Sequence, residues 1–266
     1  GKVNLNSTLD LEGGSWKVVG QTVWDSEQHG KHQATVLESF EESSNVGMAK
    51  IAMAHYSNNV NEYYKHLTKL RLDSFSGIDL IGERRPQITK PGDKLYGPTT
   101  LPWMAFGYGV AVTPLQTLTL YNAIANNGEM IKPQFVSEIK EWNKVIKKYD
   151  KEVINSKICS DETVKKIQAV LKNVVEKGTG KSLYSKDFSM AGKTGTAQAN
   201  YGTNGGNDKH YISSFVGYFP AENPKYSCIV VVHKPDAANK GYYGADVAGP
   251  VFKRIAQKIF TDSPST

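Results

Sequence analysis

The chain has 266 residues, 39% of them hydrophobic and 22% charged, so it can bury a full hydrophobic core and lacks the composition of a disordered protein. No apolar run reaches the roughly 18 residues that a membrane-spanning helix needs. The net charge of +6 comes from scattered lysines and only four arginines, which argues against nucleic acid as a partner.

The first part of the chain predicts a loop region followed by two helices. Residues 1–33 are rich in glycine and polar residues, with an alternation at 16–24 that predicts one short strand pair. Apolar residues at helical spacing cover 34–42 and 46–55. The polar Ser43-Ser44-Asn45 between them predicts a junction at which one helix ends and the next is capped.

The remainder mixes helices and strands. Residues 73–113 form a long connection with glycine and proline, unusual in a compact domain unless it shapes a site. Thr113 and Pro114 predict a helix N-cap followed by proline at the first helical position. The elements predicted after residue 60 are helices at 60–70 and 114–126, a hairpin of 130–141 with 145–153, a helix from Ser160 to the glycines at 178 and 180, strands at 190–199, 210–219 and 226–233, and a helix at 246–260.

This order of elements predicts the α+β class. Short links between the last two strands favour antiparallel pairing, since a parallel pair would need a crossover. We expect one domain over residues 1–266: a loop and hairpin region at 1–33, a mostly helical part with a hairpin at 34–180, and a strand-rich part with a final helix at 181–262.

Several sites are not favoured by the sequence. Gly192-Lys193-Thr194 and Gly180-Lys181-Ser182 look like the end of a nucleotide-binding P-loop, but the glycine needed five positions earlier is replaced by Asp187 and Val175. The six histidines and two cysteines show neither the spacing of a metal site nor that of a disulfide framework. We therefore expect no metal and no other cofactor.

Two short motifs carry residues suited to acyl transfer. In the strand predicted at 190–199, Lys193 and Gly195 point to one face and Thr194 and Thr196 to the other. Gly195 leaves room for close approach to the backbone, so this edge suits an extended peptide that ends in a carboxylate. Ser43-Ser44-Asn45 adds a hydroxyl and an amide on short side chains. Together these groups could supply a proton relay, a carboxylate anchor and an oxyanion donor.

With these motifs and the segments around them, the sequence resembles the penicillin-binding transpeptidase domain of class B D,D-transpeptidases. The resemblance implies a penicillin-binding and serine β-lactamase-like fold, with an antiparallel sheet flanked by helices. A serine β-lactamase, a penicillin-sensing domain and a non-catalytic peptide-binding scaffold are the alternatives. The segments that carry the resemblance, over roughly residues 5–260, are Phe106-Gly107-Tyr108-Gly109, Val112-Thr113-Pro114-Leu115-Gln116, residues 174–180, residues 191–198, residues 214–220 and Tyr242-Tyr243-Gly244.

One departure from the family concerns the nucleophile, the serine of a Ser-x-x-Lys motif that precedes Ser-x-Asn. The only such motif here, Ser137-Glu138-Ile139-Lys140, follows Ser-x-Asn and lies in a strand pattern, where positions i and i+3 face opposite sides. The chain begins with Gly1 and shows no signal segment. We therefore expect the nucleophile, its lysine and the first sheet strands to precede Gly1, and the chain alone to be inactive.

The resemblance implies a role for each catalytic residue present. A serine activated by the missing lysine attacks the penultimate D-Ala carbonyl of a stem peptide. Ser43 relays a proton toward the leaving D-Ala amine, and Asn45 holds the substrate amide oxygen. Lys193 keeps the pocket positive and tunes Ser43.

The resemblance also implies the substrate contacts and the partners. Thr194 and Thr196 bind the terminal carboxylate, the Thr196 N–H forms half of the oxyanion hole, Gly195 gives clearance, and Ser44 is expected among the substrate-binding residues. The partners implied are the peptidoglycan stem peptide, β-lactams and the cell-wall synthesis machinery, without nucleic acid. The location implied is the bacterial envelope, on the periplasmic side of the inner membrane, with a membrane anchor outside this sequence.

Overall fold

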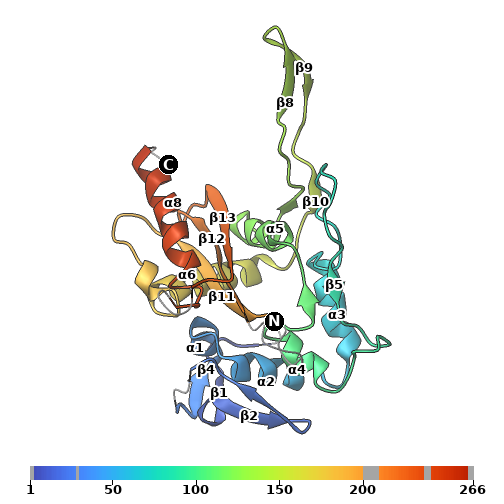
Figure 1. Ribbon diagram of the computed structural model, residues 1–266, viewed down its shortest axis with the longest axis vertical. Coiled ribbons are helices and arrows are strands. Elements are labelled where there is room, and N and C mark those ends of the chain that lie inside the picture. The colour runs from blue at the N-terminus through green and yellow to red at the C-terminus, as the bar shows by residue number, and fades with distance from the viewer. Residues whose placement is uncertain (1–2, 28–29, 200–209, 237–240, 263–266) are drawn as a thin grey trace.

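The computed structural model describes residues 3–27, 30–199, 210–236 and 241–262, and the parts of the predicted segments outside these ranges are not described. A three-stranded sheet with helices on both faces forms the upper part of the body in Figure 1, and the N-terminal helices and short strands form the lower part. In the described part of the chain, every helix is too short or too polar to cross a lipid bilayer. The predicted α+β class is confirmed.

The central sheet has the strand order β11-β12-β13 and is antiparallel throughout. Its strands are β11 (Ala191–Gln198), β12 (Tyr211–Phe219) and β13 (Tyr226–His233), which confirms the three predicted strands and their antiparallel pairing. Among the described strands, β13 pairs only with β12, so its other edge is open there.

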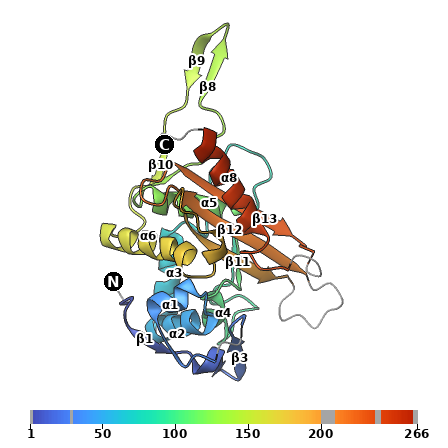
Figure 2. The same cartoon turned by 90° about the vertical axis from the view of Figure 1, so that its left-hand side faces the viewer.

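Each face of the sheet packs on a different helix. On one face, Phe215 and Phe219 contact Phe252 of α8 (Ala248–Asp262), and all three rings are buried. On the other face, Tyr218 packs with residues of α5 (Pro114–Ala125). Figure 2 shows the sheet between these two helices, with α6 (Asp161–Glu176) beside β11.

The helices begin where the capping residues predict. Thr113 caps α5 and Pro114 occupies its first turn, as expected, and Gln116 bonds back to Thr113 in a capping box. Ser160 caps α6 by accepting from the N–H of Thr163. Among the described residues, the other helices are α1 (Val36–Glu41), α2 (Asn45–Tyr56), α3 (Val60–Lys69), α4 (Thr100–Met104) and the 3-10 turns η1 (Glu12–Gly14) and η2 (Lys181–Leu183).

The other strands form two-stranded ladders, and the predicted strand pair at residues 16–24 is confirmed by β2 with β3. The connection at 73–113 contains only short elements among its described residues. The ladders join β1 (Thr8–Asp10) with β4 (Gln33–Thr35), β2 (Ser15–Val18) with β3 (Gln21–Trp24), β5 (Gln87–Ile88) with β6 (Val110–Ala111), β7 (Met130–Ile131) with β10 (Val153–Asn155), and β8 (Glu138–Glu141) with β9 (Lys144–Lys148).

The hairpin predicted at 130–153 is divided into two ladders. Pro133 follows β7 and has no N–H to donate, which interrupts the ladder after its first pairs. Beyond the interruption, β8 and β9 project from the body, as Figures 1 and 2 both show. Trp142 and Asn143 form the tip, both at positive φ (49° and 65°), and every residue of β9 is exposed.

Candidate functional site

The corner between α1 and α2 places the two neighbouring serines in different environments. Ser43 lies two residues beyond the end of α1 and has a left-handed backbone conformation, with φ of 59°. Its N–H donates to the Phe40 carbonyl at 3.1 Å. Its side chain is half-buried, and its hydroxyl makes no hydrogen bond among the described residues. The Ser43 hydroxyl is therefore open to exchange a proton with a bound group.

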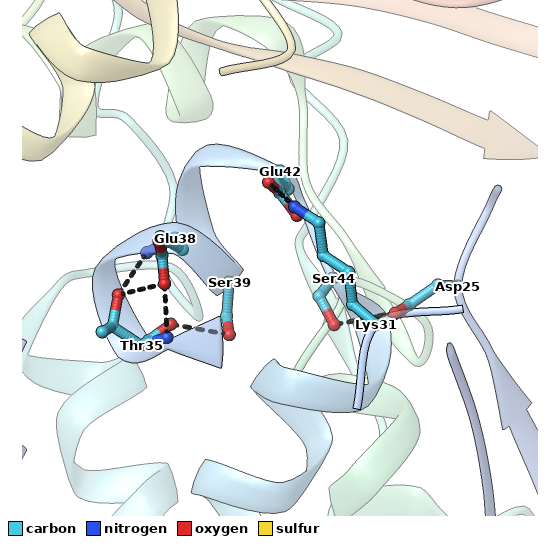
Figure 3. Close-up of polar contacts among 7 residues, drawn as sticks. All are labelled: Asp25, Lys31, Thr35, Glu38, Ser39, Glu42 and Ser44. Atoms are coloured by element: carbon cyan, nitrogen blue, oxygen red, sulfur yellow. Dashed lines mark hydrogen bonds and ion pairs between the residues drawn. The ribbon is translucent and has the colours of Figure 1, made fainter. Parts of the chain in front are cut away.

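Ser44 is buried and holds the corner together. Its hydroxyl accepts from the N–H of Gly47 at 2.9 Å, which caps α2, and donates to the Asp25 carboxylate at 2.9 Å. Asp25 also accepts from the N–H of Val46 at 2.9 Å. Figure 3 shows Ser44 directed at Asp25, with Thr35 capping the neighbouring helix α1. Because Ser44 is only 3% exposed and its hydroxyl is committed to these bonds, it acts as a helix cap instead of the expected substrate contact.

Asn45 is the first residue of α2, and its side-chain amide is hydrogen-bonded to the strand β3. Its Nδ2 donates to the Trp24 carbonyl at 2.7 Å, at the end of β3. The residue is half-buried, and its side-chain oxygen has no donor among the described residues. Its amide oxygen can therefore accept from a ligand, while Nδ2 has one of its two protons left to donate.

Lys193 lies on β11 without a carboxylate partner among the described residues. Its Nζ is 3.3 Å from the Thr194 carbonyl oxygen and 3.4 Å from the Thr194 hydroxyl. Desolvation by burial lowers the pKa of Lys193 to about 8. At neutral pH the ammonium is thus mostly charged, and its charge is available to an anion.

The hydroxyls that follow Lys193 on β11 are hydrogen-bonded to neighbouring loops. The Thr194 hydroxyl lies 2.8 Å from the Thr179 hydroxyl, beyond the end of α6. The Thr196 hydroxyl accepts from the N–H of Gly244 at 3.0 Å. A hydroxyl can donate one hydrogen bond and accept two, so both threonines keep capacity for a ligand.

Gly195 allows close packing on the strand, as its lack of a side chain predicts. A Cβ at this position would lie 2.5 Å from the Ser214 hydroxyl oxygen on β12. A Cβ on Gly244 would lie 2.7 Å from the Gly195 carbonyl oxygen, so the loop before α8 also rests directly on this part of β11.

Two contacts hold α1, which ends two residues before Ser43, close to β11 and to the turn after α6. The Nζ of Lys193 lies 5.9 Å from the centroid of the Phe40 ring on α1, within range of a cation–π contact. The N–H of Thr179 donates to the Glu41 carbonyl at 3.0 Å. Sequence reasoning included Thr179 only within a flanking segment and did not single out Phe40, because their roles arise from packing between distant segments.

The remaining Ser-x-x-Lys motif lies elsewhere. Ser137 immediately precedes β8, and Lys140 lies on that strand, in the hairpin that projects from the body (Figure 1). The Nζ of Lys140 is paired with the Glu138 carboxylate at 2.5 Å. The structure does not bring this motif to the corner or to β11.

The chain is similar in sequence to known proteins. Residues 1–257 match the penicillin binding protein transpeptidase domain. The chain is 31% identical over 229 residues to "Peptidoglycan D,D-transpeptidase FtsI" of Buchnera aphidicola subsp. Baizongia pistaciae, covering 86% of this chain and 38% of that protein. It is 30% identical over 263 residues to "Stage V sporulation protein D" of Bacillus subtilis, covering 96% of this chain and 38% of that protein. The chain thus spans well under half the length of these relatives.

Solved structures show the same fold. The apo transpeptidase domain of Burkholderia pseudomallei penicillin-binding protein 3 matches with a TM-score of 0.81 and 25% identity, over 99% of this chain and 74% of that one. Penicillin-binding protein 3 of Mycobacterium tuberculosis in complex with aztreonam matches with a TM-score of 0.80 and 28% identity, over 99% of this chain and 59% of that one. The predicted fold is confirmed, and the chain belongs to the penicillin-binding protein transpeptidase domain family.

Proposed function

We propose that this chain carries the substrate-binding side of a peptidoglycan D,D-transpeptidase, which acts on D-Ala-D-Ala stem peptides through a serine acyl-enzyme and is a target of β-lactams. The observation that carries the proposal is the contact of Lys193 with the Phe40 ring, three residues before Ser43, together with the hydrogen bond of Thr194 to Thr179, whose N–H bonds the end of α1. In the proposed site a cation, hydroxyls and the amide of Asn45 act together. These are the groups that acyl transfer to and from a peptide carboxyl end requires.

In this proposal, the residues of the corner act on the reacting bond. The Ser43 hydroxyl relays a proton to the leaving D-Ala amine, since it has no competing hydrogen bond in the described structure. Asn45 holds the substrate amide, oriented by the bond from its Nδ2 to Trp24. Lys193 keeps the pocket positive, and its charge tunes the proton affinity of the Ser43 hydroxyl.

The residues of β11 bind the carboxyl end of the peptide. Thr194 and Thr196 donate to the terminal carboxylate, and the ammonium of Lys193 attracts it. The N–H of Thr196 supplies half of the oxyanion hole, and Gly195 keeps β11 packed closely on Ser214 of β12, so that the strand can present its edge to the extended substrate. Ser44 is left out of this set because its hydroxyl caps α2 and bonds Asp25.

We further propose that the nucleophilic serine and its lysine come from a segment outside this sequence, and that the chain alone does not acylate. Ser137 and Lys140 do not replace them, because they lie on the projecting hairpin and Lys140 is paired with Glu138. The parent protein would act at the extracytoplasmic side of the bacterial membrane, together with cell-wall synthesis proteins.

Two measurements on the isolated chain test the proposal. A fluorescent penicillin should leave no covalent adduct on a denaturing gel, and a stable adduct would overturn the assignment of the nucleophile to another segment. Diacetyl-L-Lys-D-Ala-D-Ala should shift the amide resonances of β11 and of the corner, and Lys193→Gln should weaken this binding. Ser137→Ala is the matched control and should leave it unchanged. Binding that survives Lys193→Gln, or no binding by the wild type, would refute the proposed site.

A further inference from the structure

Thr179 is hydrogen-bonded to both halves of the candidate site. Its N–H donates to the carbonyl of Glu41, two residues before Ser43, at 3.0 Å. Its hydroxyl lies 2.8 Å from the hydroxyl of Thr194 on β11. One residue in the turn after α6 thus joins the end of α1 to the strand that carries Lys193.

The neighbouring glycine shows how closely these segments approach. A Cβ on Gly178 would lie 2.3 Å from the Glu41 carbonyl oxygen, far inside van der Waals contact. Gly178 does not have a positive φ, so a glycine is required here by the contact and not by the backbone conformation. The end of α1 and the turn after α6 therefore touch backbone to backbone, and Thr179 is held at a fixed distance from both partners.

The bonds around the Thr194 hydroxyl determine where its proton can point. This oxygen lies 3.4 Å from the Lys193 Nζ, which can only donate. If Thr179 is the second donor, both acceptor positions of the Thr194 oxygen are filled, and its own proton points away from Lys193 and Thr179. A carboxylate, which accepts hydrogen bonds, then meets a proton on Thr194 instead of a lone pair.

We propose that Thr179 is a positioning residue that donates its hydroxyl proton to Thr194 and thereby presents the Thr194 proton to the substrate carboxylate. Through its backbone N–H, the same residue sets the separation between Ser43 and β11. The consequence is selectivity: the site prefers a peptide with a free carboxyl end over the same peptide with a carboxamide end. This selectivity rests on the proposed function, whereas the Thr179–Thr194 bond does not.

The first arm of the test compares two probes, diacetyl-L-Lys-D-Ala-D-Ala and its C-terminal carboxamide. Thr179→Val should bind the carboxylate probe up to about tenfold more weakly, because the Thr194 hydroxyl then loses the donor that turns its own proton toward the carboxylate, with little effect on the carboxamide. Thr179→Ser should restore the preference. Thr117→Val, which removes a hydroxyl bonded within α5, is the matched control and should leave it unchanged. An unchanged ratio of the two affinities in Thr179→Val would overturn the proposal.

The second arm needs no ligand. Urea unfolding of Thr179→Val, Thr194→Val and the double variant forms a double-mutant cycle. The effect of Thr194→Val should shrink in the Thr179→Val background, and strictly additive effects would refute the hydroxyl–hydroxyl bond. If the wild type binds neither probe, the proposed function fails while the cycle still decides the Thr179–Thr194 bond. If Thr179→Val does not fold, Thr179→Ala replaces it in both arms.

Discussion

Replacement of the two adjacent serines separates their roles most directly. Ser44→Ala removes the cap of α2, which contributes about 1 kcal/mol, and the hydrogen bond to the Asp25 carboxylate, which contributes about 1.5–3 kcal/mol. Asp25 keeps the N–H of Val46, so its charge is not left without a donor. We expect the free energy of unfolding to fall by about 2.5–4 kcal/mol, a large share of the roughly 5–15 kcal/mol that stabilises a typical domain.

Ser43→Ala is the matched control, since it deletes the same atom one position earlier. The Ser43 hydroxyl makes no hydrogen bond among the described residues, so its loss should change the free energy of unfolding by less than about 0.5 kcal/mol. Ser43→Gly should stabilise the chain by up to about 1 kcal/mol, because φ at this position is 59°. Urea titrations followed by circular dichroism give all three values. Equal losses for Ser43→Ala and Ser44→Ala would refute the reasoning.

Three further predictions concern the sheet and its charge. Phe252→Ala should lower the free energy of unfolding by about 3–5 kcal/mol, because the ring is buried against the sheet. Ile255→Ala on the same helix is the control: Ile255 is 37% exposed, so its loss should cost only about 1 kcal/mol. If urea unfolding gave similar losses of stability for both variants, the packing on α8 would be contradicted. Burial lowers the pKa of Lys193 from 10.5 to about 8, so the unfolded chain binds this proton more tightly than the folded chain does. Between pH 8 and 10.5 the wild type should therefore gain stability with rising pH, and the difference in free energy of unfolding between the wild type and Lys193→Met should increase over this range. A difference that stays flat from pH 8 to 10.5 would show that burial does not perturb Lys193. Among the described strands, the outer edge of β13 is unpaired, and we expect this edge to drive self-association in sedimentation velocity. The double variant Tyr226→Lys with His233→Lys should reduce the association, because antiparallel pairing of two copies brings these two ends of β13 together. A wild type that stays monomeric at high concentration would count against an available edge.

The elements with strong local signals were predictable from the sequence. Thr113 and Pro114 define the start of α5 through a hydroxyl cap and a preset φ, both of which act within four residues. The apolar run in β13 and the short link before it likewise define the antiparallel pairing of β12 with β13. The division of the long hairpin follows from Pro133, which has no N–H to donate. The alternation of residues alone predicts a single hairpin, without regard to this proline.

The polar contacts of the candidate site were less predictable, because they join residues far apart in the chain. The pattern Ser43-Ser44-Asn45 indicated a cap, but it could not tell which serine would be buried until Asp25, from the loop after β3, was placed against Ser44. The link between Thr179 and Thr194 depends in the same way on how α6 packs beside β11. Spacing along the chain carries no information on such contacts.

The projecting β8–β9 hairpin has a practical consequence. A two-stranded ladder in which every residue of β9 is exposed adds little to the hydrophobic core, and its tip is a two-residue turn at Trp142 and Asn143. A foreign segment spliced in at this tip lengthens a surface loop, at an entropic cost that grows by only about 0.6 kcal/mol for each doubling of loop length. The tip is therefore the natural place to attach a fluorophore or an affinity tag without disturbing the sheet.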